Sequence, residues 1–195
     1  MNVVFDIGNV LLSFEPKMFL EAAFNSQDTA EILMETIFAS NEWRLLDQNV
    51  ITADEAAEKF TSVHPQLKSE IQFVMKNWLK MLSPIDSTVD MLKQISKKHG
   101  TYYLSNMPVQ ALDYIDREFD FWDLFKGGIF SCDIKMIKPN PDIFDYFLKE
   151  YKLNPADCIF IDDSAANIKT AESFGIDGVL ADSPRTVSKV LEKYL

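Results

Sequence analysis

The stretch VVFDIGNVL, residues 3–11, decides the fold, because an apolar run there ends in an acidic residue and a flexible turn. Residues 3–5 are β-branched or aromatic, which is typical of a strand buried on both faces. Asp6 is the first polar residue after this run, and Gly8 lets the backbone turn sharply behind it. The stretch therefore predicts a buried parallel strand that presents a carboxylate at its carboxyl end.

Four further apolar runs resemble the first in length and composition: Tyr102–Leu104, Gly128–Phe130, Cys158–Ile161 and Gly178–Leu180. Amphipathic helical patterns separate them, at residues 86–99 before Gly100 and at residues 141–151. The second helix has Asn140 as its N-cap and a proline at its first position. Strands that alternate with helices predict an α/β fold with a Rossmann-like parallel sheet covered on both faces.

Residues 15–82 break this alternation, since they carry helical patterns and no convincing strand. Thr52 and Glu55 form the sequence pattern of a capping box at the start of one of these helices. We expect a four- or five-helix insertion that stands over the sheet. The predicted division is a core domain of residues 1–14 and 83–195 and a helical domain of residues 15–82.

Composition and charge exclude several classes of protein. The 195 residues are 47 % apolar and 25 % charged, as in an ordinary globular domain, and the net charge is −11. Such a charge opposes binding to nucleic acid and to an anionic membrane surface. No apolar run approaches the ~20 residues that span a bilayer, and residues 1–12 lack the basic start of a signal peptide.

The two cysteines bear on the cellular compartment. Cys132 and Cys158 lie far apart in the sequence, and Cys158 falls in an apolar run that is typical of a buried reduced thiol. Together with the missing signal peptide, this favours a cytoplasmic protein. Nothing in the sequence specifies an oligomeric state.

Polar side chains follow four of the predicted strands: three groups come directly after a strand, and Lys138 comes later, immediately before the helix capped by Asn140. In an open α/β sheet ligands bind at the carboxyl ends of the strands, so these side chains define the candidate site. They are Asp6, then Ser105 with Asn106, then Lys138, and finally Asp162 with Asp163. Each motif alone is common in helix caps and turns, but their order along one sheet edge favours a functional site.

A metal ion and a phosphate group would both suit this edge. Asp6, the Gly8 carbonyl, Asp162 and Asp163 offer hard oxygen ligands, and crowded carboxylates need a cation such as Mg²⁺. Lys138 would neutralise an incoming phosphoryl group, and the hydroxyl of Ser105 and N–H groups near Asn106 would hold its oxygens. A nucleophilic carboxylate, a metal, a fixed cation and hydrogen-bond donors together indicate phosphoryl transfer.

These four segments resemble the ordered motifs of the haloacid dehalogenase superfamily, and they are spread over the whole chain. They read VVFDIGNVL, LSN ending at Asn106, KPNPDIF from Lys138 and IDDSAANI from Ile161. The helical insertion resembles the cap domain that this family inserts after its first strand. The residues DIGNV of the first motif are similar to those of a bacterial branch that includes α-D-glucose-1-phosphate phosphatase. They are more distantly similar to those of the phosphatase domain of soluble epoxide hydrolase.

The resemblance implies a Mg²⁺-dependent phosphatase that acts on a small phosphorylated metabolite, with a sugar phosphate such as glucose 1-phosphate favoured. Asp6 would be the nucleophile, and Lys138 would orient it and stabilise charge. Ser105 and Asn106 would grip the phosphoryl group. Asp162 or Asp163 would hold the metal with Asp6 and the Gly8 carbonyl, with a slight preference for Asp163, and Asn167 would support them.

Gly8 departs from the family pattern, which usually has an aspartate two residues after the nucleophile as the general acid and base. Its loss predicts a slower enzyme or a restriction to good leaving groups, unless a replacement comes from the cap or through water. Glu42, Trp43, Arg44 and Asp47 could line the substrate pocket. Alternatively, Trp43 belongs to the core of the cap and the three charged residues are solvated. Two alternatives stay open: a metal-independent dehalogenase, which the acidic pair disfavours, and a non-catalytic binding protein.

Overall fold

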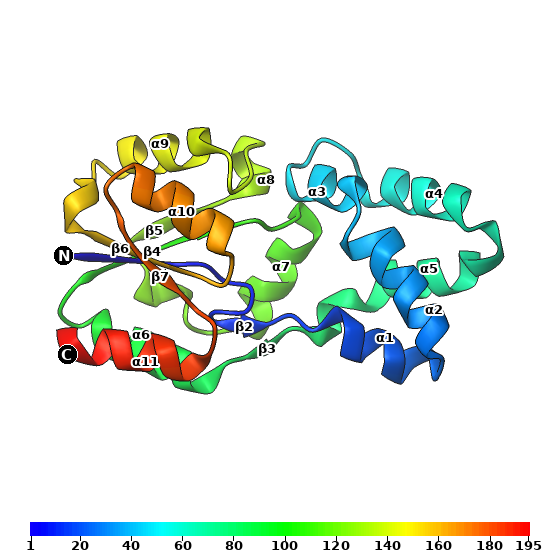
Figure 1. Ribbon diagram of the computed structural model, residues 1–195, viewed down its shortest axis with the longest axis horizontal. Coiled ribbons are helices and arrows are strands. Elements are labelled where there is room, and N and C mark those ends of the chain that lie inside the picture. Colours follow the sequence, from blue (N-terminus) through cyan, green and yellow to red (C-terminus); the bar gives the residue numbers. More distant parts are fainter.

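The computed structural model describes all 195 residues, and its centre is a five-stranded parallel sheet (Figure 1). The sheet has the strand order β5-β4-β1-β6-β7. The bounds are Asn2–Phe5 for β1, Gly100–Ser105 for β4, Gly127–Phe130 for β5, Cys158–Asp162 for β6 and Asp177–Leu180 for β7. Each of the five predicted runs lies in one of these strands, so the predicted α/β fold with a Rossmann-like sheet is confirmed.

Helices cover both faces of the sheet (Figure 1). The helices α9 (Pro141–Glu150) and α10 (Ala165–Ser173) pack with Val4 and Phe160 on one face. The helices α6 (Asp86–Ile95), α7 (Val109–Glu118) and α11 (Pro184–Leu191) pack with Val3, Phe5 and Ile161 on the other. Because neighbouring strand residues point to opposite faces, the unbroken apolar runs bury side chains in both layers.

The helix ends follow local chemistry. Asn140 accepts a hydrogen bond from the backbone N–H of Asp142 at 3.0 Å, which confirms it as the N-cap of α9. The helix predicted at residues 86–99 ends at Ile95, and residues 96–99 form hydrogen-bonded turns instead. These four residues are polar, so no apolar face continues the helix. Gly100 begins β4, where it pairs in register with Asn2.

Between β1 and α6 the chain forms the predicted helical insertion. Its helices are α1 (Pro16–Phe24), α2 (Gln27–Leu33), α3 (Asn41–Asp47), α4 (Ala53–Val63) and α5 (Lys68–Asn77). A π-helical turn at Met34–Phe38 and a 3₁₀ turn at Trp78–Met81 complete it. At the start of α4, Glu55 and Thr52 exchange hydrogen bonds of 3.2 Å and 2.8 Å, so the capping box is confirmed.

Two short strands that the sequence did not predict join the insertion to the sheet. Leu12–Ser13 (β2) and Ser83–Pro84 (β3) pair antiparallel, and the hydroxyl oxygens of Ser13 and Ser83 lie 2.7 Å apart. Figure 1 shows this ribbon between the sheet and the helices α1–α5. The two segments that connect the sheet to the insertion are therefore paired with each other where the insertion begins and ends.

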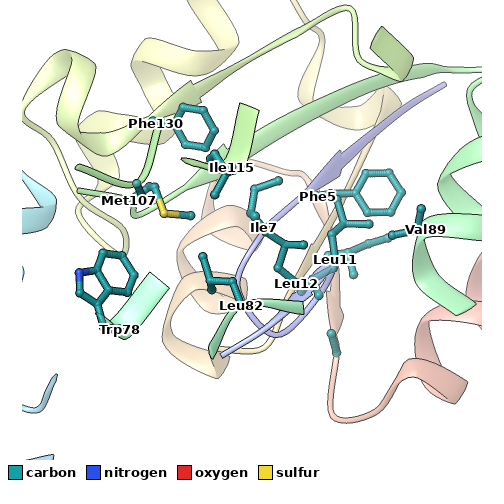
Figure 2. Packing of buried hydrophobic residues seen from close by; sticks show 14 of the residues in the cluster. Phe5, Ile7, Leu11, Leu12, Trp78, Leu82, Val89, Met107, Ile115 and Phe130 are labelled. Carbon is teal, nitrogen blue, oxygen red and sulfur yellow. The ribbon is translucent and has the colours of Figure 1, made fainter. Parts of the chain in front are cut away.

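Apolar contacts continue from the sheet into the insertion. One cluster of buried side chains contains residues of both parts, and Figure 2 shows some of them, among them Trp78, Leu82 and Met107. Trp78 and Leu82 close the insertion, and Met107 follows β4. No helix is both long and apolar enough to cross a lipid bilayer.

Candidate active site

The carboxyl ends of β1 and β6 and the loop before α9 bring four charged side chains together. Carboxylate oxygens of Asp6, Asp162 and Asp163 lie within 4.8 Å of one another. The ammonium of Lys138 lies 3.0 Å from Oδ1 of Asp6 and 2.6 Å from Oδ2 of Asp162. Segments up to 157 residues apart in the sequence thus meet at one sheet edge, as the topology of a parallel sheet requires.

Asp162 is completely buried and its carboxylate is fully engaged. Its Oδ1 accepts from the backbone N–H of Ser164 at 2.8 Å, and Asn167 donates to both oxygens at 2.9 and 3.0 Å. With Lys138 on Oδ2, little capacity remains for another ligand. Asp162 therefore acts as a fixed anion that holds the ammonium of Lys138 in place.

Asp163 is exposed and has far fewer partners. Its Oδ2 accepts a hydrogen bond of 2.9 Å from the side chain of Asn9, whose own Oδ1 accepts from the backbone N–H of Phe14. Asn9 adopts a left-handed backbone conformation with φ 54°, which asparagine tolerates better than most residues. Asn9 thereby ties the turn after β1 to the acidic pair, and sequence reasoning did not single it out.

Lys138 is buried, and its charge depends on its neighbours. Burial alone would lower the pKa of Lys138, but Asp6 and Asp162 outweigh burial and raise it above its ordinary value. The ring of Phe160 lies beneath the ammonium, 5.3 Å from the nitrogen to the ring centroid. Lys138 is therefore a permanent cation at neutral pH.

Asp6 is held by several donors. Its Oδ1 accepts from the backbone N–H of Ile7 at 2.7 Å as well as from Lys138, so rotation of the carboxylate is restricted. Burial raises the pKa of Asp6; Lys138 lowers it, Asp162 raises it, and the hydroxyl of Ser105 lowers it by a hydrogen bond. Burial outweighs the donors and raises the pKa to about 7, so added positive charge at this edge would lower the pKa and favour the anion.

Two loops offer backbone groups that have no internal partner. Neither the N–H nor the carbonyl of Gly8 takes part in a hydrogen bond, and the N–H of Asn106 is also free. The side chain of Asn106 is occupied, because it exchanges hydrogen bonds of 2.8 and 3.0 Å with the backbone of Lys138. Asn106 can therefore offer its N–H to a ligand, while its amide positions the loop that carries Lys138.

A small cavity of about 140 Å³ opens beside these groups. Its walls come from the turn after β1, the loop after β4 and the insertion: Gly8, Phe14, Trp43, Asp47, Trp78, Leu82, Asn106, Met107 and Pro108. Most of these side chains are apolar, and the rings of Trp43 and Trp78 lie 5.1 Å apart at their centroids. The cavity is thus largely apolar, and it adjoins the charged cluster through Gly8, which follows Asp6 by two residues, and Asn106, which binds the backbone of Lys138.

Asp47 is the one ionisable side chain among the nine residues of this cavity. Of the polar cluster considered in the sequence, Trp43 and Asp47 line the cavity, while Glu42 and Arg44 do not. Burial raises the pKa of Asp47 to about 7, Asp6 adds to this effect, and Arg44 opposes it. Asp47 therefore faces the site as a carboxyl group that is partly protonated near neutral pH.

Ser131 anchors the end of α3 to the core. Its buried hydroxyl donates to the backbone carbonyl of Asp47 at 2.6 Å and accepts from the backbone N–H of Met107 at 2.9 Å. The side-chain amide of Gln48 also reaches the carbonyl of Lys135 at 3.5 Å. Sequence reasoning missed Ser131, because a serine after a strand carries no signal of a contact with residues 84 positions away.

We expect Asp47→Asn to raise the free energy of unfolding by about 1–3 kcal/mol at pH ~8, and to leave it unchanged below pH ~4. Folding raises the pKa of Asp47 from 3.8 to about 7. The folded protein therefore holds a proton that the unfolded chain releases, and wild-type stability falls as pH rises through this window. Asparagine does not ionise and escapes this loss.

The measurement is urea unfolding of both proteins across this pH range, in EDTA. Asp6 and Arg44 are the charged groups that act on Asp47, and both are present in the variant, so the difference isolates Asp47. A variant that is less stable than the wild type at pH ~8 would show that burial does not destabilise the ionised carboxylate of Asp47.

The donor set of the sheet edge fits a hard divalent cation. Asp6, Asp162 and Asp163 face the single ammonium of Lys138, so the ionised cluster carries a net charge of −2. The exposed carboxylate of Asp163 and the unpaired carbonyl of Gly8 are oxygen donors on the open side of the cluster. Oxygen donors without histidine or thiolate suit Mg²⁺ rather than zinc or copper.

The parallel sheet is covered by helices on both faces, and a charged cluster lies at the carboxyl ends of its strands. A cavity adjoins this cluster next to the inserted helices. These features together are typical of an α/β enzyme. The chain belongs to the haloacid dehalogenase-like hydrolases, whose family model matches residues 1–175. It is a hydrolase of this family, and the predicted membership is confirmed.

Two of the proteins similar to this chain over most of its length are named as phosphatases. A sesquiterpene phosphatase of Aspergillus oryzae is 25 % identical over 185 residues, which cover 94 % of this chain and 91 % of that protein. A D-ribitol-5-phosphate phosphatase of Bacteroides thetaiotaomicron is 21 % identical over 187 residues, covering 90 % and 89 %. The structure of a family enzyme of the same bacterium with magnesium and inorganic phosphate superposes with a TM-score of 0.72, at 22 % identity and 92 % coverage of both chains.

Proposed function

We propose that this protein hydrolyses a small phosphomonoester in a Mg²⁺-dependent reaction, with Asp6 as the nucleophile. The observation that carries the proposal is the buried ammonium of Lys138, fixed 3.0 Å from Asp6 and 2.6 Å from Asp162 beside a cavity. A cation that is paired on both sides cannot leave its place, so it is preorganised for charge that develops in a transition state.

The chain's own residues account for binding and for the covalent step. Lys138 and the free N–H groups of Gly8 and Asn106 would bind the phosphoryl oxygens, with Ser105 next to them. An oxygen of Asp6 attacks phosphorus, the bond to the leaving oxygen breaks, and water later cleaves the aspartyl phosphate to release inorganic phosphate. When bound by Asp6, Asp163 and the carbonyl of Gly8, Mg²⁺ would supply further positive charge to the phosphoryl oxygens.

The cavity bears on the kind of leaving group. Six of its nine residues have apolar side chains, and only Asp47 and Asn106 have polar ones. A sugar buries several hydroxyls that each need a partner, so this wall favours a small, largely apolar alcohol over glucose 1-phosphate. The phosphatases similar to this chain are named for a sesquiterpene and for a sugar alcohol, so both substrate kinds belong in the test.

We expect phosphate release that requires Mg²⁺, stops in EDTA, and has a higher kcat/KM for short alkyl, prenyl and aromatic phosphates than for sugar phosphates. The assay measures inorganic phosphate from a panel that also contains glucose 1-phosphate, ribitol 5-phosphate and p-nitrophenyl phosphate. An Asp6→Asn protein purified in the same way controls for contaminating phosphatases. Release that is equal with and without metal, or absent from every ester, contradicts the proposal.

Two further assignments belong with this proposal. We propose that residues 15–82 act as a cap domain over residues 1–14 and 83–195, since β2 and β3 pair the two connecting segments with each other. We also propose the cytoplasm as the place of action, in keeping with the unpaired and buried Cys132 and Cys158. The substrate would then be a phosphorylated metabolite of that compartment.

A further inference from the structure

We propose that Asp47 gives the proton to the leaving oxygen and afterwards takes a proton from the attacking water; this inference rests on the proposed phosphatase function. An alkoxide is a poor leaving group unless it is protonated as it departs. The proton must come from a group that faces the cavity where the leaving alcohol lies.

Elimination leaves Asp47. Eight of the nine residues of the wall have no ionisable side chain, and Gly8 has no side chain at all. Asp6 is committed as the nucleophile, and the ammonium of Lys138 is locked between two carboxylates. Asp162 is saturated by Lys138, Asn167 and Ser164. Asp47 alone combines an ionisable group, a place in the cavity wall and a carboxylate without a hydrogen-bond partner.

A hydrogen bond from Ser131 holds the backbone of Asp47 in place. Ser131 binds its carbonyl at 2.6 Å and also binds the N–H of Met107, which follows the proposed phosphate-binding Asn106. One buried hydroxyl therefore links α3, which carries Asp47, to the loop after β4, which carries Asn106. Trp43 lies one turn earlier on α3, is buried and also lines the cavity. Its packing therefore keeps the face of α3 that carries Asp47 turned toward the cavity.

The protonation state of Asp47 suits this role. Its burial and the negative charge of Asp6 raise its pKa to about 7, against the opposing charge of Arg44. A carboxyl group with a pKa near the working pH can both give and take a proton. This property supports the assignment, which rests on the geometry of the cavity.

The two steps balance in atoms and charge. In the first, an oxygen of Asp6 bonds to phosphorus, the bond from phosphorus to the leaving oxygen breaks, and that oxygen receives the proton of Asp47. In the second, the carboxylate of Asp47 takes a proton from water, whose oxygen bonds to phosphorus while the bond to Asp6 breaks. The products are the alcohol and inorganic phosphate, and both aspartates return to their starting states.

The test compares two substrates in Asp47→Asn. With an alkyl phosphate, we expect phosphoryl transfer in the first turnover to slow by ~10²–10⁴-fold, the usual worth of general acid catalysis. With p-nitrophenyl phosphate, whose leaving group departs without a proton, the first turnover should stay near the wild-type rate. Steady turnover should still be slow, because water has lost its base, so about one p-nitrophenolate per enzyme should appear as a burst.

Two further variants sharpen the test. A side chain at Gly8 would meet no atom within 4 Å of its Cβ, so Gly8→Asp can place a carboxyl group at the other end of the cavity. In the Asp47→Asn background we expect it to recover at least tenfold of the lost alkyl phosphate turnover. Glu42→Gln, on the same helix but outside the cavity wall, should retain wild-type rates.

The outcomes separate the two proposals. Alkyl phosphate turnover within about threefold of wild type in Asp47→Asn overturns the role of Asp47 while the phosphatase function stands. Equal slowing of the first turnover with both substrates, or no recovery by Gly8→Asp, shows a structural effect and also overturns it. A folded wild type that releases no phosphate from any ester overturns the proposed function itself.

Discussion

Replacing Asp6 with asparagine is expected to lower the turnover of every phosphate ester by at least ~10⁴-fold, on the scale of losing the nucleophile in covalent catalysis. Asparagine has nearly the same size and shape, so Lys138 keeps its contact with Asp162. What is lost is the anionic oxygen that attacks phosphorus. The variant should also fail to take up phosphate covalently when it is mixed with substrate and quenched in acid.

The measurement is single-turnover kinetics, together with mass spectrometry of the peptide that contains residue 6. Asp177→Asn is the control, because it makes the same carboxylate-to-amide change at an exposed residue at the start of β7, outside the charged cluster. The control should behave as wild type. Activity of Asp6→Asn within about tenfold of wild type would exclude Asp6 as the nucleophile, whatever the metal dependence of the reaction.

The sequence predicted the strands because the sheet is buried on both faces. Every residue of β6 is buried, so its apolar run is unbroken and easy to recognise. The ribbon of β2 and β3 was missed for the opposite reason. Each of these strands has two residues, and their pairing depends on the two ends of an insertion of some seventy residues meeting in space. No local pattern records such a meeting.

The candidate site divides in the same way. Asp6, Lys138 and Asp162 could be placed together from sequence, since the ends of parallel strands share one edge of a sheet. Asn9, Ser131 and Trp78 could not, because their roles depend on contacts between segments that only the packed fold brings together. The catalytic roles of Asp6 and Lys138 and the metal-binding role of the acidic pair stay predictions.

The acidic pair illustrates what sequence order leaves open. Asp162 and Asp163 are adjacent and chemically identical, yet one is buried with every lone pair engaged and the other is exposed with a single partner. The last residue of a strand points into the packed edge and the next one points outward. This alternation supports Asp163 over Asp162 as the direct ligand of Mg²⁺.

Lys138→Met is expected to lower the free energy of unfolding by about 3–5 kcal/mol at pH ~8 in EDTA, the usual cost of breaking a buried ion pair. The methionine fills much of the same volume, but Asp6 and Asp162 lose their shared cation. Two buried carboxylates then face each other without compensation. Activity should fall with stability, because the phosphoryl group loses the same charge.

The stability loss should shrink on acidification to pH ~5 and on addition of Mg²⁺. Without Lys138 the pKa of Asp6 in the folded state rises further above its unfolded value of 3.8. A carboxyl group with a raised folded pKa loses stability as pH increases, so acid restores what alkaline pH removes. A divalent cation would replace the missing positive charge and act in the same direction.

Lys149→Met supplies the matched control, and burial is the variable that it isolates. Lys149 and Asp145 form an ion pair of 2.6 Å, the same length as that of Lys138 with Asp162, but their side chains are 75 % and 50 % exposed. Removing an exposed pair should change stability by no more than about 0.5 kcal/mol. Equal losses in the two variants by urea unfolding would mean that the length of the pair, rather than its burial, decides its contribution, and the view of Lys138 as the fixed charge of the site would fall with it.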